Sequence, residues 1–196
     1  MFGCRIGKLS VLALLAGVGT HVCASETVQI SQFGEEISFQ LPDGFSSGYS
    51  QKSDDALLIE YPNSGATLDN WSEMVTISLH HMGGRIDTVA IASFMSQSAS
   101  EQCTREVVAG FVQPQVTVGE IIFDTLYVSC GRKKGASESE AYVAHIASTP
   151  ESIVTIQRAL KGKSKLNSQA FDDEWFLRTI SVWPIVINGE YLMDLN

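Results

Sequence analysis

Residues 74–103 read MVTISLHHMGGRIDTVAIASFMSQSASEQC, and the spacing of their apolar side chains changes halfway along. From Met74 to His80 apolar and polar residues alternate, which predicts a β-strand with one apolar face. After Asp87 the apolar and small residues recur every three to four positions, which predicts a helix with an N-cap at Asp87 that reaches Cys103. A strand followed by such a helix indicates a domain of the α+β class.

Strand patterns continue on both sides of this stretch. The residues expected in strands are 28–30, 37–41, 56–61, 107–111, 116–120, 121–130, 142–147 and 153–160. A second helix is expected over Phe171–Trp183, ended by Pro184, and the tail from Asn188 is expected to be loosely held. We therefore predict one α+β domain over residues 25–196, in which an antiparallel β-sheet packs with two main helices.

Residues 1–24 have the three parts of a cleavable secretory signal peptide. Two basic residues come first, an apolar run follows over 9–18, and short side chains occupy 22–24. The apolar run is shorter than the roughly 20 residues that span a bilayer, so we expect cleavage rather than an uncleaved anchor. A lipidated Cys23 is a further alternative, but the residues before it lack the usual lipoprotein pattern. The expected location is the periplasm or the extracellular space.

The mature chain is expected to be acidic. The formal net charge of the whole sequence is −9, and loss of Arg5 and Lys8 with the signal peptide makes it −11. Such a surface does not favour nucleic acid or anionic lipid, which bind basic faces. No later stretch is long and apolar enough to form a transmembrane segment. The expected partner is therefore another protein.

Two of the four cysteines, Cys4 and Cys23, leave with the signal peptide. The remaining pair, Cys103 and Cys130, most simply forms a disulfide in an exported protein. Both lie on the apolar sides of their predicted elements, which indicates a bridge between helix and sheet. A metal or redox pair is the alternative, but the spacing is not C-x-x-C and no further ligand cluster lies nearby. Asp124 shares the inward side of the strand with Cys130, and the sequence does not explain it.

The segment Ile37–Phe45, ISFQLPDGF, is similar to the opening hairpin and turn of Mog1/PsbP-like sandwich proteins. The chain further resembles an uncharacterised bacterial exported protein family in the segments 60–62 (EYP), 70–76 (NWSEMVT) and 156–159 (IQRA). The resemblance also includes a cysteine in the helix and one at a strand end, and it covers nearly the whole mature chain. It implies a binding or accessory role and no reaction.

Groups that could carry chemistry do not form a recognised constellation. His80 and His81 are neighbours in a strand, so their side chains point to opposite faces and do not readily share a metal ion. Serine, histidine and acidic residues occur, but their presence alone does not define a triad. The acid pairs 54–55 and 172–173 fit a loop and a helix start. We expect no catalytic residue, cofactor or metal ligand.

The candidate binding surface consists of Glu60, Tyr61, Asn70 and Trp71, around a strand end and a turn. Trp71 can serve as an aromatic anchor for a partner. The alternative is that Trp71 covers one end of the core and Asn70 caps a turn. The basic residues of 158–165 could meet an acidic partner, or could only protect a hairpin edge from aggregation.

These observations predict an exported, non-enzymatic interaction or accessory protein. One alternative is a secreted effector or hydrolase of unrecognised type. A polar pocket that gathers His80 or His81 with Glu60 or Asp69 would favour that alternative. The other is a periplasmic immunity-type inhibitor that neutralises a toxin.

Overall fold

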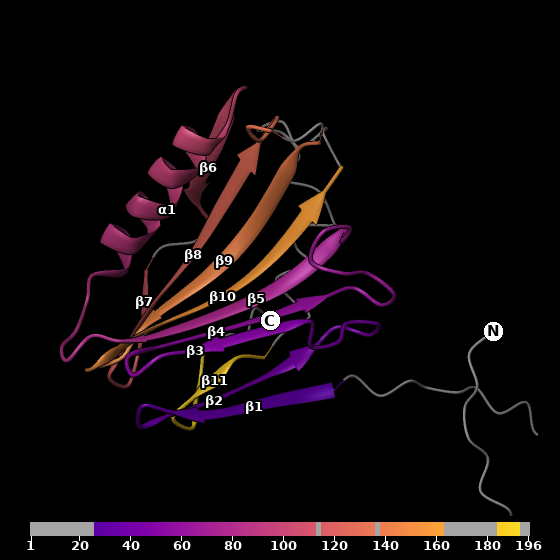
Figure 1. Ribbon diagram of the computed structural model, residues 1–196. Helices are drawn as coiled ribbons and strands as arrows, with labels where there is room; N and C mark the ends of the chain where they lie inside the picture. Colours follow the sequence, from indigo (N-terminus) through magenta and orange to yellow (C-terminus); the bar gives the residue numbers. More distant parts are fainter. Residues whose placement is uncertain (1–25, 113–114, 136–137, 163–183, 193–196) are drawn as a thin grey trace, which may run out of the picture.

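Two antiparallel β-sheets lie face to face, and one described helix covers part of the outer face of the larger sheet (Figure 1). The computed structural model describes residues 26–112, 115–135, 138–162 and 184–192. The smaller sheet has the order β1-β2-β11-β12, and the larger has the order β3-β4-β5-β10-β9-β8-β6, with β7 paired to β8. The elements are β1 Glu26–Gln32, β2 Glu35–Leu41, β3 Tyr49–Lys52, β4 Ala56–Pro62, β5 Glu73–His81, α1 Thr88–Gln102, β6 Val107–Phe111, β7 Val116–Val118, β8 Ile121–Cys130, β9 Glu140–Ser148, β10 Ser152–Lys161, β11 Val186–Ile187 and β12 Glu190–Tyr191.

The main core lies between the two sheets. The alternation expected in β5 is confirmed, because Val75, Ile77 and Leu79 are fully buried and belong to this core. Ile37 and Phe39 of β2 enter it from the smaller sheet. Burial of such aliphatic and aromatic side chains is the main force that holds two sheets together.

A second, smaller core lies between α1 and the outer face of the larger sheet. Ala92 of the helix packs there with Leu126 of β8 and Ile146 of β9. The helix begins as expected, because the Asp87 carboxylate accepts a hydrogen bond from the Val89 backbone N–H at 2.9 Å. No helix among the described residues is long and apolar enough to cross a membrane.

The predicted antiparallel α+β architecture is confirmed, but the expectation of two main helices is not. The described residues contain one helix, α1. The second expected helix, Phe171–Trp183, lies outside the described residues. So does the predicted signal peptide, residues 1–24, and the boundaries of the predicted domain 25–196 stay predictions.

Asp124, the unexplained polar residue of the sequence, fixes the start of α1. Its buried carboxylate accepts hydrogen bonds from the Thr88 hydroxyl at 2.5 Å and from the Gln115 side-chain amide at 2.8 Å. The Gln115 amide also donates to the Thr88 hydroxyl at 2.9 Å. A negative charge is stabilised beside the N-terminal end of a helix. Asp124 therefore accepts a hydrogen bond from Thr88, the first residue of α1, and holds this end of the helix against β8.

Glu35, another buried acid, ties together three turns that are remote in the sequence. Its carboxylate accepts hydrogen bonds from the Thr149 hydroxyl at 2.6 Å and from the Asn188 side-chain amide at 2.7 Å. The Asn188 backbone N–H in turn donates to the Glu36 carbonyl at 2.8 Å. These bonds join the β1–β2, β9–β10 and β11–β12 turns.

The expectation of a loosely held tail from Asn188 is therefore wrong for the residues up to Leu192. Val186 and Ile187 pair with β2, and Ile187 and Leu192 are buried in the main core. The sequence pattern missed these strands because each has only two residues, too few to show an alternation.

His145 lies in β9 with its ring fully buried. Its Nδ1 is 3.1 Å from the Thr125 hydroxyl oxygen, and its ring stacks on Phe123 with centroids 5.8 Å apart. Burial disfavours the charged imidazolium and lowers the pKa of His145 from 6.5 to about 4. The side chain is thus a neutral part of the folded core at neutral pH.

Candidate functional site

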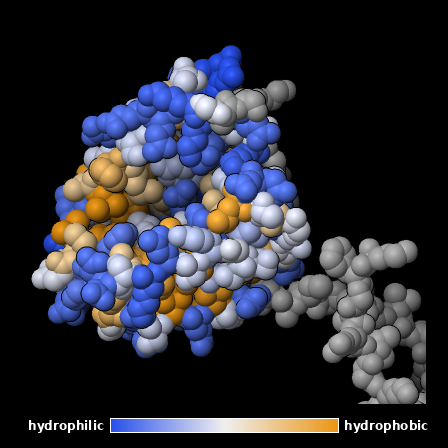
Figure 2. Space-filling model, in the orientation of Figure 1, coloured by the Kyte–Doolittle hydropathy of each residue, from blue (hydrophilic) through white to orange (hydrophobic). Residues whose placement is uncertain are grey.

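A groove lies on the outer face of the larger sheet, beside α1 (Figure 2). Its first part, the apolar cleft, has a volume of about 240 Å³ and lies against the C-terminal half of α1. Its second part, the polar pocket, has a volume of about 660 Å³ and lies beside the loop that joins β4 to β5. The two parts share Lys133, Glu140 and Gln157 in their linings, so they lie side by side.

The apolar cleft is lined by Phe94, Met95 and Ala99 of α1 and by Tyr142 of β9. Phe94 is 70% exposed, a large fraction for an aromatic side chain. Burial and the neighbouring Glu140 carboxylate raise the pKa of the Tyr142 hydroxyl to about 12. That hydroxyl stays neutral at physiological pH, and the cleft offers an apolar contact surface with an exposed ring at its rim.

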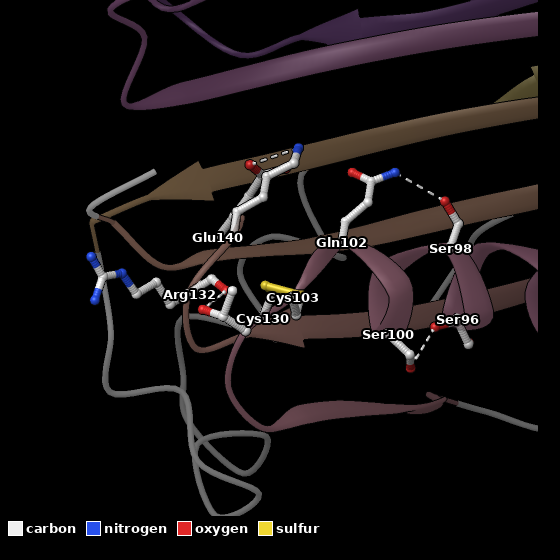
Figure 3. Close-up of a disulfide and its surroundings, with 10 residues drawn as sticks. Ser96, Ser98, Ser100, Gln102, Cys103, Cys130, Arg132 and Glu140 are labelled. Carbon is white, nitrogen blue, oxygen red and sulfur yellow. Dashed lines mark hydrogen bonds and ion pairs between the residues drawn. A yellow bond between two sulfur atoms is a disulfide. The ribbon is translucent and has the colours of Figure 1, made fainter. Parts of the chain in front are cut away.

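The predicted disulfide Cys103–Cys130 is confirmed and forms one end of the apolar cleft (Figure 3). It joins the C-terminal end of α1 to the end of β8, as the inward positions of both cysteines indicated. Lys133 follows β8 and lies 3.5 Å from the Glu140 carboxylate. The bridge thus fixes the helix against the strands that line the groove.

The polar pocket is bounded by neutral side chains of the sheet and by charged side chains around them. Thr76 and Gln157 come from β5 and β10, and Met74 and Leu68 supply apolar contact. Four carboxylates and two ammonium groups line it: Glu60, Asp69, Glu138, Glu140, Lys133 and Lys161. The lining therefore has an excess of negative charge.

Ser139 lines the same pocket with a buried hydroxyl that lacks a hydrogen-bond partner. The residue is only 8% exposed, and its Oγ has no hydrogen-bond partner among the residues that the structure describes. Because buried hydroxyls are nearly always hydrogen-bonded, an unpaired one in a pocket wall marks a place where a ligand group would be accommodated.

The loop between β4 and β5 is held in one conformation by two asparagines. The Asn63 carboxamide oxygen accepts from the Ser72 and Glu73 backbone N–H groups at 3.2 and 3.1 Å. The Asn70 carboxamide oxygen accepts from the Thr67 backbone N–H at 2.6 Å. The loop presents Trp71 to the pocket as a fixed rather than a freely moving side chain.

The structure brings together two of the four residues of the candidate binding surface. Glu60 and Trp71 both line the polar pocket. Trp71 is 7% exposed, and the Lys161 ammonium lies 3.8 Å from its ring centroid. Asn70 caps the loop turn, and Tyr61 points to the opposite face of the sheet, into the main core.

Neither His80 nor His81 lines the polar pocket. Both lie at the far end of β5 from Met74, where β5 pairs with the start of β10. His81 stacks against Phe33 with ring centroids 6.1 Å apart. The pocket gathers Glu60 with Asp69 but without a histidine, so the arrangement that would favour a hydrolase is not formed there.

The segment Gly44–Gly48, GFSSG, fits the G-x-S-x-G spacing of serine hydrolases. That motif functions on a sharp turn from a strand into a helix. Here it lies between β2 and β3, and the exposed Ser46 is followed by a strand. The spacing therefore has no nucleophile geometry in this fold. Within the described residues, no group of three His, Cys, Asp or Glu side chains is placed to hold a metal ion.

No protein-family model matches the sequence, and no curated protein matches it either. Among solved structures, the fold is similar to that of the Saccharomyces cerevisiae Ran-binding protein Mog1p. The TM-score is 0.47 and the sequence identity 14%, over 75% of this chain and 83% of that chain.

Proposed function

We propose that this protein is an exported, non-enzymatic interaction module that binds a partner protein through the groove beside α1. The observation that carries the proposal is that the apolar cleft lies side by side with the polar pocket and shares three lining residues with it. An apolar centre with a polar surround is the usual composition of a protein-binding surface. Phe94 provides the exposed aromatic side chain that often dominates the binding energy of such a surface.

Export is part of the proposal, and two features support it. Residues 1–24 have the pattern of a signal peptide, and the disulfide is of a kind that persists in oxidising compartments. We assign the fold to the Mog1/PsbP-like class on the segment Ile37–Phe45. The relation to bacterial exported proteins rests on the segments 60–62, 70–76 and 156–159. Cell fractionation with N-terminal sequencing tests export, and a mature chain that starts at Ser25 is the expected result.

The binding surface can be tested with a photo-crosslinking amino acid in living cells. Incorporated at Phe94, it should form a defined covalent complex with one partner. Tyr191 on β12 is a matched control, because it is also an exposed aromatic residue, 67% against 70%, and it lies on the smaller sheet. Equal products from both positions, or none from Phe94, would refute the groove as the binding surface.

A further inference from the structure

The carboxylates of the polar pocket are not all neutralised by the protein itself. Glu140 is paired with Lys133 at 3.5 Å. Glu60, Asp69 and Glu138 have no hydrogen bond or ion pair to their carboxylates within the described part of the chain. A depression with an excess of one sign of charge concentrates the electrostatic field. It therefore attracts a group of opposite charge more strongly than a flat surface does.

Lys161 shows that a cation fits in this environment. Its ammonium lies 3.8 Å from the Trp71 ring centroid, within the range of a cation–π interaction. Because this ammonium lies over the Trp71 ring, it forms no ion pair with Glu60, Asp69 or Glu138. These three carboxylates still lack a counter-charge among the described residues. Met74 and Leu68 line the same space and would contact the alkyl part of a long basic side chain.

The Ser139 hydroxyl is an independent indication of a missing ligand group. It is more than nine-tenths buried, lines the pocket and has no hydrogen-bond partner within the described ranges of the chain. An ammonium or guanidinium group brings several N–H donors, so it could bind the carboxylates and this oxygen together. A ligand carboxylate or phosphate would instead meet the negative lining.

We propose that the polar pocket binds a lysine or arginine side chain of the partner protein, next to an apolar side chain that occupies the cleft by Phe94. The proposal rests on the proposed function and adds the chemistry of the bound segment. The shared lining of the two parts implies that the two side chains lie close together on the partner's surface.

The probe is a fluorescent octapeptide of alternating arginine and leucine, titrated by anisotropy in 150 mM salt. Removal of two pocket charges in Glu60→Gln/Glu138→Gln should weaken its binding about tenfold. The control Asp54→Asn/Glu120→Gln changes the net charge equally at exposed positions outside the groove and should change binding less than about twofold. Equal losses in the two variants, or no loss in the first, would overturn the proposal.

Carboxylate labelling tests the same site without any substitution. A carbodiimide with glycinamide should modify Glu60 and Glu138 in the free protein, and the arginine–leucine peptide should protect them while a glutamate–leucine peptide does not. Absence of modification in the free protein would mean that the chain itself or a second copy fills the pocket, which would also overturn the proposal. A crosslink from Phe94 to a partner segment without a basic residue would refute this proposal and leave the proposed function intact.

Discussion

The buried imidazole of His145 makes the stability of the protein depend on pH between about 6.5 and 4. In the unfolded chain its pKa is 6.5, and in the folded protein burial lowers it to about 4. Between these values the unfolded state binds a proton that the folded state does not, so falling pH favours unfolding. The stabilising contribution is complete above pH 6.5 and is lost as the pH falls to about 4.

The size of this effect follows from the shift in pKa. One pKa unit corresponds to about 1.4 kcal/mol, so the interval from 6.5 to about 4 gives about 3.4 kcal/mol in total. At pH 5 about 2 kcal/mol of this is already lost. Urea unfolding followed by tryptophan fluorescence at half-unit steps from pH 7.5 to 4.5 measures the loss directly.

The control is His145→Gln, which removes the titrating ring and keeps a polar side chain of similar size. The two proteins differ in no other titratable group, so the difference between the two pH profiles isolates His145. The free energy of unfolding of the variant should lack about 2 kcal/mol of the decline between pH 7.5 and 5. Parallel profiles, within about 0.5 kcal/mol, would refute the assignment of a neutral, buried imidazole.

Three further predictions concern the disulfide, the buried Asp124 carboxylate and a close contact at Gly48. Replacing both Cys103 and Cys130, which are 27 residues apart, by serine should lower the free energy of unfolding by about 3.5 kcal/mol. Reductant added to the natural protein should give the same urea midpoint as the serine variant, and a loss below about 1 kcal/mol would contradict the bridge as a main constraint. Asp124→Ala should cost about 1–3 kcal/mol in urea unfolding because it leaves the buried Thr88 hydroxyl without its acceptor, and Asp124→Asn should cost less. Gly48→Ala would put a methyl group 2.7 Å from a proline ring carbon, and its thermal midpoint should fall clearly, while Gly84→Ala has open space around it and should not.

Helices and strands whose apolar spacing extends over many residues could be predicted from the sequence. The helix after Asp87, the alternating strand around Ile77 and the inward positions of the two cysteines all follow from local spacing. Each of these patterns extends over several residues, so one face is clearly marked as apolar.

The division of the strands into two sheets could not be predicted, because it depends on which strands pair. Ile187 belongs to the main core, although its strand, β11, is only two residues long. The exception at Asp124 was visible in the sequence, but its partners Thr88 and Gln115 lie 36 and 9 residues away, which no spacing rule connects.

The candidate site was predicted in part for a similar reason. Glu60 and Trp71 are near one another in sequence and line one pocket, whereas Glu138 and Ser139 reach it from a distant connection after β8. Tyr61 was assigned to the surface because it adjoins Glu60, but neighbouring residues of a strand face opposite sides of the sheet.

The bonds of Asn188 to the β1–β2 turn have a consequence for the order in which the protein folds. Glu36 and Asn188 are 152 positions apart, and β11 supplies Ile187 to the core from the end of the chain. Contacts of such long range make folding slow, because much of the chain must be ordered before they form. The smaller sheet cannot be completed until β11 has been synthesised, which is after all the described strands of the larger sheet.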